Sequence, residues 1–143
     1  MMVLALALFA VLAAISALHL YWALGGLWPG HDARSLAETV IGEPKRREMP
    51  PLPLTVVVAA LILGAGLLAV FSQTGLPLGL PDWVLRAGLW ALALVFLARG
   101  AVTYILRAQA AAMAEPFATL NRRYYSPLCL LLGAGFLALA VAS

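Results

Sequence analysis

Four polar side chains stand out because each could bind or transfer charge inside a strongly apolar sequence. His19 closes the first long apolar run, Arg99 lies within a later one, and Asn121 and Tyr125 lie where the last one begins. A histidine can act as an acid or a base near neutral pH. An arginine in an apolar span is a functional candidate because its charge is costly there. These groups could hold a small or amphipathic molecule that carries an anionic or carbonyl group.

Two further residues join this candidate site through their positions. Thr103 follows Arg99 by four residues, so both lie on one side of a helix. Trp22 belongs to the stretch "HLYWALGGLWPG" (19–30), whose aromatic residues also suit the belt at a membrane boundary. Glu115 could neutralise the charge of Arg99. The candidate ligand-binding residues are therefore His19, Trp22, Arg99, Thr103, Asn121 and Tyr125.

Three kinds of function fit these residues, and the sequence favours a non-enzymatic role. In the first, the protein binds or moves a hydrophobic or anionic small molecule in a polar pocket near the cytoplasmic side. In the second, it is an enzyme acting on a lipid-like substrate, with His19 as the acid or base. In the third, it is an accessory or scaffold subunit whose polar groups only tie helices together.

The elements that position these residues follow from the composition. The 143 residues are 64% hydrophobic and 10% charged, with a mean hydropathy of +1.00, whereas soluble domains are about 25% charged. A helix needs about 20 apolar residues to cross a bilayer. The apolar runs show no alternation of period two, which favours helices over strands. We therefore predict an all-α, polytopic membrane protein, a single domain over 1–143, with spans at 2–24, 53–71, 83–106 and 124–142.

The connections between the spans carry weaker signals. Ser35 and Glu38 have the spacing of a capping box, and Gly42 follows, which predicts a short interfacial helix in the first loop. The segments "LGAGLLA" (63–69) and "LGAGFLA" (132–138) resemble each other. We interpret their glycines as sites where helices approach closely.

The basic residues predict the orientation in the membrane. The N-terminus, the loop 72–82 and the C-terminus carry none, and the loops 25–52 and 107–123 carry seven: Arg34, Lys45, Arg46, Arg47, Arg107, Arg122 and Arg123. Such loops are cytoplasmic by the positive-inside rule. The arginine-rich, alanine-rich composition suggests a bacterial inner membrane, with both termini outside. The net charge of +3 then reflects topology and not nucleic-acid binding.

The counts of cysteine and histidine limit the possible disulfides, metals and cofactors. The single cysteine, Cys129, excludes an intrachain disulfide. One histidine within the spans is too few for a zinc site, so we expect neither a metal nor a cofactor. Membrane lipids are the expected partners, and a homo-oligomer is left open.

Three stretches carry a resemblance to a known family. The motifs "HLYWALGG" at the end of the first span, "LARG" in the third and "RRYYSPLCLLLG" at the start of the fourth resemble a family of small bacterial four-helix integral membrane proteins. The family is catalogued only as a domain of unknown function. The resemblance implies the four-span architecture and no particular activity.

Overall fold

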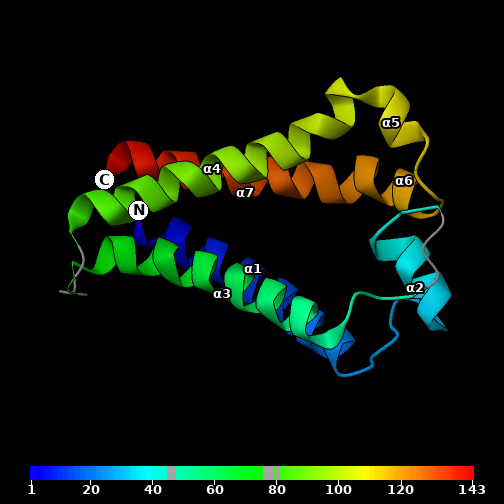
Figure 1. Cartoon of the computed structure of the whole chain (residues 1–143). Coiled ribbons are helices and arrows are strands. Elements are labelled where there is room, and N and C mark those ends of the chain that lie inside the picture. Colours follow the sequence, from blue (N-terminus) through cyan, green and yellow to red (C-terminus); the bar gives the residue numbers. More distant parts are fainter. Residues whose placement is uncertain (45–47, 76–78, 80) are drawn as a thin grey trace.

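The chain forms long helices, and shorter helices lie between some of them (Figure 1). The structure is a computed structural model and describes residues 1–44, 48–75, 79 and 81–143. The elements are α1 (Met2–Ala23), α2 (Ala33–Val40), α3 (Leu52–Thr74), α4 (Asp82–Ile105), α5 (Arg107–Ala111), α6 (Phe117–Leu120), the π-helical η1 (Asn121–Tyr125) and α7 (Ser126–Ala142). Lys45, Arg46 and Arg47, which contribute to the predicted orientation, lie outside the described residues.

Four helices in the described part of the chain are long and apolar enough to span a membrane, as predicted. The first three, α1, α3 and α4, end within three residues of the predicted limits. The fourth begins earlier than predicted, because α6, η1 and α7 run on as one helical segment, Phe117–Ala142. The protein is therefore an all-α, multi-pass membrane protein.

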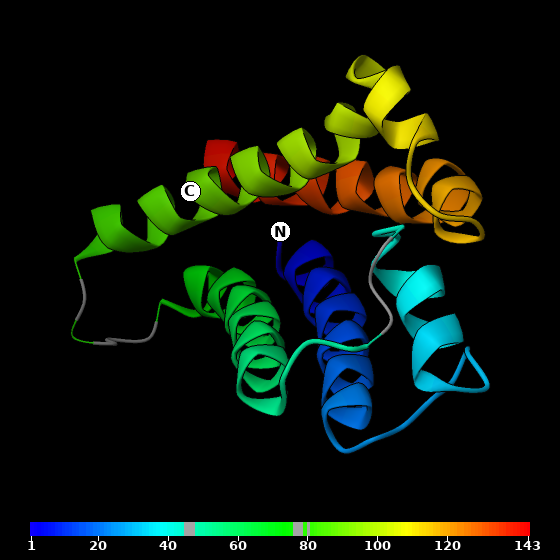
Figure 2. The ribbon, with the colours of Figure 1, turned by 45° about the vertical axis from the view of Figure 1, so that its right-hand side comes forward.

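The spans are arranged as two hairpins, one made of α1 and α3 and the other of α4 and α7 (Figures 1 and 2). Both termini lie at one end, and α2, α5 and α6 lie at the other. The buried apolar core joins all four helices near the termini, and its residues are Ala5, Leu8, Leu12, Ala65, Ala69, Leu89, Ala93, Leu132, Phe136, Leu139 and Ala140. Away from this core the hairpins diverge, and α2 lies beside the wider end.

The glycines of the two similar segments differ in what they do. Gly66 faces Phe9 and Leu12 of α1, and Gly133 faces Leu97 of α4. A Cβ atom on Gly133 would lie 2.8 Å from the backbone nitrogen of Leu97. These glycines therefore permit close helix packing, as predicted. Gly64 has nothing within 4 Å of the position a Cβ would take, so it has no such role here.

The short helix predicted in the first loop is present as α2, but its cap differs from the prediction. Asp32 is the N-cap, and its carboxylate accepts from the backbone N–H of Ser35 at 2.7 Å. The Ser35 hydroxyl returns a bond by accepting from the backbone N–H of Asp32 at 3.1 Å. Ser35 is thus at position N3 of the box and not at its N-cap. The hydrogen bond from the Ser35 amide lowers the pKa of the Asp32 carboxyl.

Candidate functional site

A cluster of buried polar side chains joins the last part of α4 to the start of the fourth span. Thr103, Asn121 and Ser126 are 6%, 3% and 0% exposed. The Asn121 amide Nδ2 donates to Oγ1 of Thr103 at 2.8 Å. The Ser126 hydroxyl lies 2.8 Å from Oγ1 of Thr103 and 3.2 Å from Oδ1 of Asn121. Since each hydroxyl carries one proton and can also accept, the three side chains can close a ring in which each donates once.

The local backbone explains why these side chains meet. Gly100 lets α4 approach α7, because a Cβ there would lie 2.8 Å from the Ser126 carbonyl oxygen. The π-helical segment η1 has the wider register of its class, with the Ser126 N–H donating to the Asn121 carbonyl. In that register the Arg122 carbonyl would accept from residue 127, which is a proline without an N–H. The hydroxyl of Tyr104 donates to this carbonyl instead, at 2.8 Å.

Arg99 extends the cluster to the surface of the molecule. Its Nη2 donates to Oδ1 of Asn121 at 3.0 Å, and the residue as a whole is exposed. The sequence led us to expect Glu115 as its counter-charge, and this was wrong: the Glu115 carboxylate accepts from the backbone and hydroxyl of Thr119 at 3.2 and 3.1 Å. No carboxylate among the described residues forms an ion pair with Arg99. In the described part of the chain, the hydrogen-bond partner of the Arg99 guanidinium is therefore a neutral amide, that of Asn121.

A groove of about 540 Å³ opens beside Arg99. Asn121 and Thr103 form its polar floor, and Gln109 adds an amide from α5. The rest of its lining comes from α2, α4, α5 and the segment that follows, and consists of Val40, Ile41, Val102, Leu106, Ala110, Met113 and Phe117. The groove thus combines an apolar wall with one positive group, the combination that an amphipathic anion requires.

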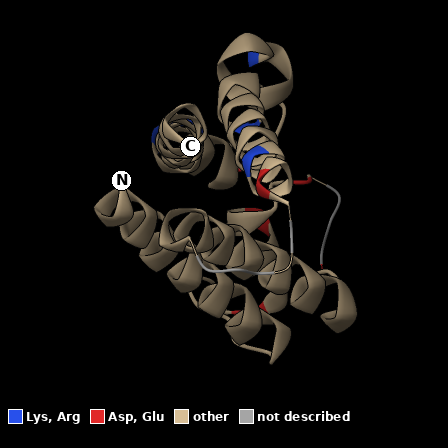
Figure 3. Ribbon diagram, turned by 90° about the vertical axis from the view of Figure 1, so that its left-hand side faces the viewer, with Lys and Arg blue, Asp and Glu red and all other residues tan. Residues whose placement is uncertain are grey.

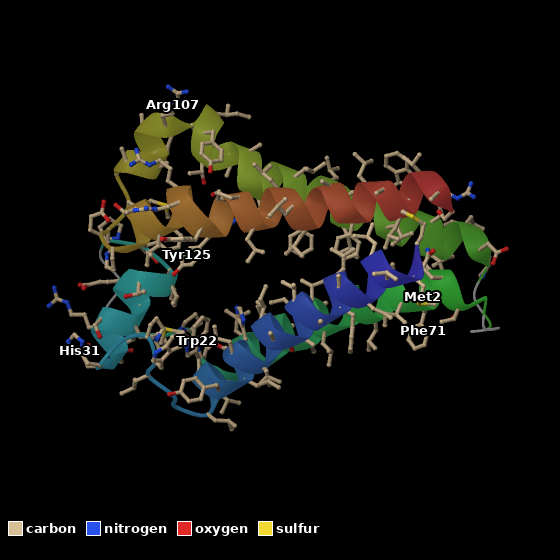
Figure 4. The ribbon with its side chains drawn as sticks, turned by 180° about the vertical axis from the view of Figure 1, so that it is seen from behind. Met2, Trp22, His31, Phe71, Arg107 and Tyr125 are labelled. Atoms are coloured by element: carbon tan, nitrogen blue, oxygen red, sulfur yellow. The ribbon has the colours of Figure 1, made fainter. Side chains whose placement is uncertain are left out.

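The other predicted site residues have different surroundings. The Tyr125 hydroxyl donates to the Thr39 carbonyl of α2 at 3.3 Å, and its ring packs 5.7 Å from that of Phe117. Figure 4 shows Tyr125 on the side of its helix that faces α2. It thus ties α2 to the fourth span next to the groove, although it does not line the groove.

His19 and Trp22 belong to the other hairpin. The Nδ1 atom of His19 lies 2.8 Å from the Ile15 carbonyl, and its ring packs 5.0 Å from that of Trp22. The Trp22 indole donates to the Trp28 carbonyl at 2.7 Å. These contacts are those of a helix end, where the aromatic side chains of the stretch 19–30 stabilise the turn that follows α1. The structure does not bring His19 or Trp22 into the cluster around Arg99.

The candidate list omitted Ser126, which belongs to the cluster, and Tyr104, whose hydroxyl donates to the nearby Arg122 carbonyl. Ser126 stands directly before a proline at the start of a span, which is a common place for serine, so its type alone gives no signal. The sequence did contain one signal, Pro127. A proline lacks the backbone N–H that would bond to a preceding helical carbonyl, so another donor must bond to that carbonyl.

A comparison with known families identifies the family of this chain. A model of the family described as "Protein of unknown function (DUF3995)" matches residues 3–136. The chain belongs to that family. The match covers all four spans up to Phe136, and with them both the core and the Arg99 cluster. No curated protein and no solved structure matches this DUF3995 chain.

Proposed function

We propose that this protein binds an amphipathic molecule with an anionic headgroup in the groove beside Arg99. The observation that carries the proposal is the charge of Arg99, which stands in a spanning helix without a carboxylate partner among the described residues. Arg99 precedes the end of α4 by six residues, or about 9 Å. An anion that enters the groove would supply the missing counter-charge, and its apolar part would lie against the wall formed by α2 and α5.

Energetics favour a ligand over a bare arginine. An arginine at the centre of a spanning helix costs about 2.5–3.5 kcal/mol on insertion scales, and less toward an end. One hydrogen bond to Asn121 uses one of the five guanidinium N–H groups. The remaining donors have no hydrogen-bond partner among the described residues, so they can form charge-assisted bonds, which are roughly twice as strong as neutral ones.

A scaffold role is the second candidate, and one observation favours it. In the described part of the chain, every buried side-chain nitrogen and oxygen has a hydrogen-bond partner. Thr103, Asn121 and Ser126 therefore need no ligand to be satisfied, and they tie α4 to α7 by themselves. Under this alternative, Arg99 only strengthens the tie through Asn121.

We also propose that the groove lies on the cytoplasmic side of a bacterial inner membrane. The groove opens at the end where α2 and α5 lie, opposite both termini. The basic loops of the sequence connect the helices at this same end, and such loops remain cytoplasmic. Among the described residues, the basic side chains of these loops are Arg34, Arg107, Arg122 and Arg123.

The test compares two probes with matched tails, palmitate and hexadecanol, by native mass spectrometry of the detergent-solubilised protein. We expect palmitate to bind. Arg99→Gln should weaken palmitate binding about tenfold or more, which is the effect of losing one charged hydrogen bond. Binding of the uncharged hexadecanol should be weak and insensitive to this change. Asn121→Asp should also abolish the preference for palmitate, because it places a carboxylate against Arg99 and keeps the arginine in place.

Arg86→Gln is the matched control, since Arg86 lies in the same helix at the opposite end and donates to the Ser143 carbonyl. This variant should bind palmitate like the original protein. Equal binding of palmitate and hexadecanol, or palmitate binding unchanged by Arg99→Gln, would reject the proposal. If Arg99→Gln lowers thermal stability and no palmitate adduct is seen in any variant, the scaffold role is favoured.

A further inference from the structure

A second pocket of about 520 Å³ lies at the same end of the molecule. It shares only Thr103 and Ala110 with the groove beside Arg99. Its charged lining consists of Arg107, Arg122 and Glu115, and its other lining residues are Tyr104, Ala111, Ala118 and Thr119. The charges distinguish this pocket from the mainly apolar groove described above.

The two arginines of this pocket are positioned but not neutralised. Arg107 is held by its Nε atom, which donates to the Tyr104 carbonyl at 3.2 Å. The backbone of Arg122 is held by the Tyr104 hydroxyl. Neither guanidinium forms an ion pair with a carboxylate among the described residues, although Glu115 lines the same pocket. Their terminal nitrogens are therefore available to a phosphate, whose oxygens arginine binds well.

Glu115 is fixed on another wall of the pocket. Its two oxygens accept from the backbone N–H and the hydroxyl of Thr119, one bond to each oxygen. A carboxylate oxygen has room for further donors beyond one. The pocket thus offers two sites for a negative group and one for a positive group that can donate hydrogen bonds.

The pocket lies at the depth of lipid headgroups. The helical segment Phe117–Ala142 has 26 residues, which corresponds to about 39 Å, whereas the hydrocarbon core is about 30 Å thick. The segment is apolar to Ala142, so the end that projects is the one that carries Arg122 and Arg123. Arg107 is the first residue of α5 and lies two residues after the end of α4. Figure 4 shows Arg107 at the outer edge of this end of the molecule.

We infer that this pocket binds the headgroup of a zwitterionic phospholipid that carries a phosphodiester and a primary ammonium. Arg107 and Arg122 hold the phosphate, and Glu115 accepts from the ammonium. A choline headgroup fits less well because its quaternary ammonium has no N–H to donate. A glycerol headgroup leaves Glu115 without a cation. This site uses other charged residues than the groove beside Arg99, so it does not rest on the function proposed above.

The experiment measures binding of three lipids with identical tails, the dioctanoyl forms of phosphatidylethanolamine, phosphatidylcholine and phosphatidylglycerol, to the whole protein in detergent by native mass spectrometry. We expect phosphatidylethanolamine to bind best. The double variant Arg107→Gln, Arg122→Gln should weaken it about tenfold or more. Glu115→Gln should remove its advantage over phosphatidylglycerol and leave phosphatidylglycerol bound.

Two controls separate this site from its neighbours. Arg123→Gln should leave all three affinities unchanged, because Arg123 does not line the pocket and its guanidinium lies 5.7 Å from the Tyr124 ring centre. Arg99→Gln should leave phosphatidylethanolamine binding unchanged, whatever it does to palmitate.

Three results would overturn the inference. The first is equal binding of the three lipids by the original protein. The second is phosphatidylethanolamine binding that survives the double arginine variant. The third is complete displacement of the lipid by inorganic phosphate, which would assign the pocket to free phosphate groups instead. If the double variant does not fold, Glu115→Gln decides by itself, because Glu115 is exposed and its change of lipid preference needs no comparison of stability.

Discussion

At the scale of single residues, Asn121 organises the candidate site because its amide has both a donor and an acceptor end. The acceptor Oδ1 receives Arg99 and the donor Nδ2 serves Thr103. An aspartate here would neutralise Arg99 and lose the donor to Thr103. The amide therefore holds the arginine in place and leaves its charge available, which is what an anion site needs.

Removing one hydroxyl from the ring tests its contribution to stability. Thr103→Val nearly keeps the shape of the side chain but leaves the Asn121 Nδ2 donor and the Ser126 hydroxyl without this partner. We expect the free energy of unfolding to fall by about 1–3 kcal/mol, the cost of an unsatisfied buried polar group. The measurement is SDS-induced unfolding in mixed micelles, followed by circular dichroism.

The matched control is Thr39→Val, at a threonine of α2 whose hydroxyl donates to the Ser35 carbonyl of its own helix at 2.7 Å. Its effect should stay within about 0.5 kcal/mol, as for most substitutions away from buried polar networks. Equal effects of the two substitutions would mean that the ring adds nothing beyond a local hydroxyl bond.

The sequence identified the polar partners on α4 more reliably than those on α1, for a physical reason. Arg99 in an apolar span must find a polar partner, and the asparagine and threonine near it in the fold were the available ones. His19 needs no partner from another helix, because an imidazole can form a hydrogen bond within its own helix, as it does with the Ile15 carbonyl. The residue type of His19 therefore suggested a chemical role but did not indicate which other residues lie near it.

At the scale of elements, the contact between α4 and α7 depends on matched irregularities in the two helices. On α4, Gly100 removes the side chain that would meet the Ser126 carbonyl. In the fourth span, the register of the π-helical η1 and the missing N–H of Pro127 leave the Arg122 carbonyl without a backbone donor. The Tyr104 hydroxyl donates to this carbonyl instead. The motifs "LARG" and "RRYYSPLC" that carry the family resemblance thus meet at one contact.

Adding a single methyl group at Gly100 tests this contact. Gly100→Ala places a Cβ 2.7 Å from Leu130 and 2.8 Å from the Ser126 carbonyl, and the backbone oxygen cannot move away alone. We expect a loss of about 1–3 kcal/mol in unfolding free energy from this overpacking, together with weaker palmitate binding as the Arg99 cluster separates. Thermal unfolding in detergent and native mass spectrometry measure the two effects.

Gly64→Ala is the control for helix propensity, since Gly64 has open space around it. Alanine is the better helix former by about 1 kcal/mol, so this substitution should leave stability unchanged or raise it. A stabilising Gly100→Ala would show that α4 and α7 pack less closely in the membrane than described here.

The sequence predicted the number of spans and the approximate limits of the first three, but not how the spans pair. Hydropathy determines the spans because an unsatisfied backbone cannot cross lipid. Pairing is harder because the lipid-facing and packed faces of α1, α3 and α7 are equally apolar, so no stripe marks the buried side. The early start of the fourth span was missed because Arg122 and Arg123 interrupt the apolar run, although the helix itself continues through them.

At the scale of the whole molecule, the two ends of the bundle have different roles. Near the termini the four helices share one apolar core, with Phe96 and Phe136 stacked at 5.6 Å. At the other end the hairpins diverge, and the polar cluster, the groove and the second pocket all lie there. Charged residues occupy only short stretches of the ribbon (Figure 3). The core end therefore holds the four spans together, and the features on which both binding proposals rest lie at the other end.

The orientation of these two ends in the membrane decides which leaflet both proposed binding sites face, and it can be measured. If the basic loops are cytoplasmic, a cysteine at the C-terminus faces outside and cysteines in α2 or α5 loops face the cytoplasm. In a Cys129→Ala background, we expect Ser143→Cys to react with a membrane-impermeant maleimide in intact bacterial spheroplasts. His31→Cys and Ala112→Cys, both at exposed positions, should react only after lysis. The reverse pattern would place the groove and the second pocket on the outer leaflet, where their ligands would have to be lipids or solutes from outside the cell.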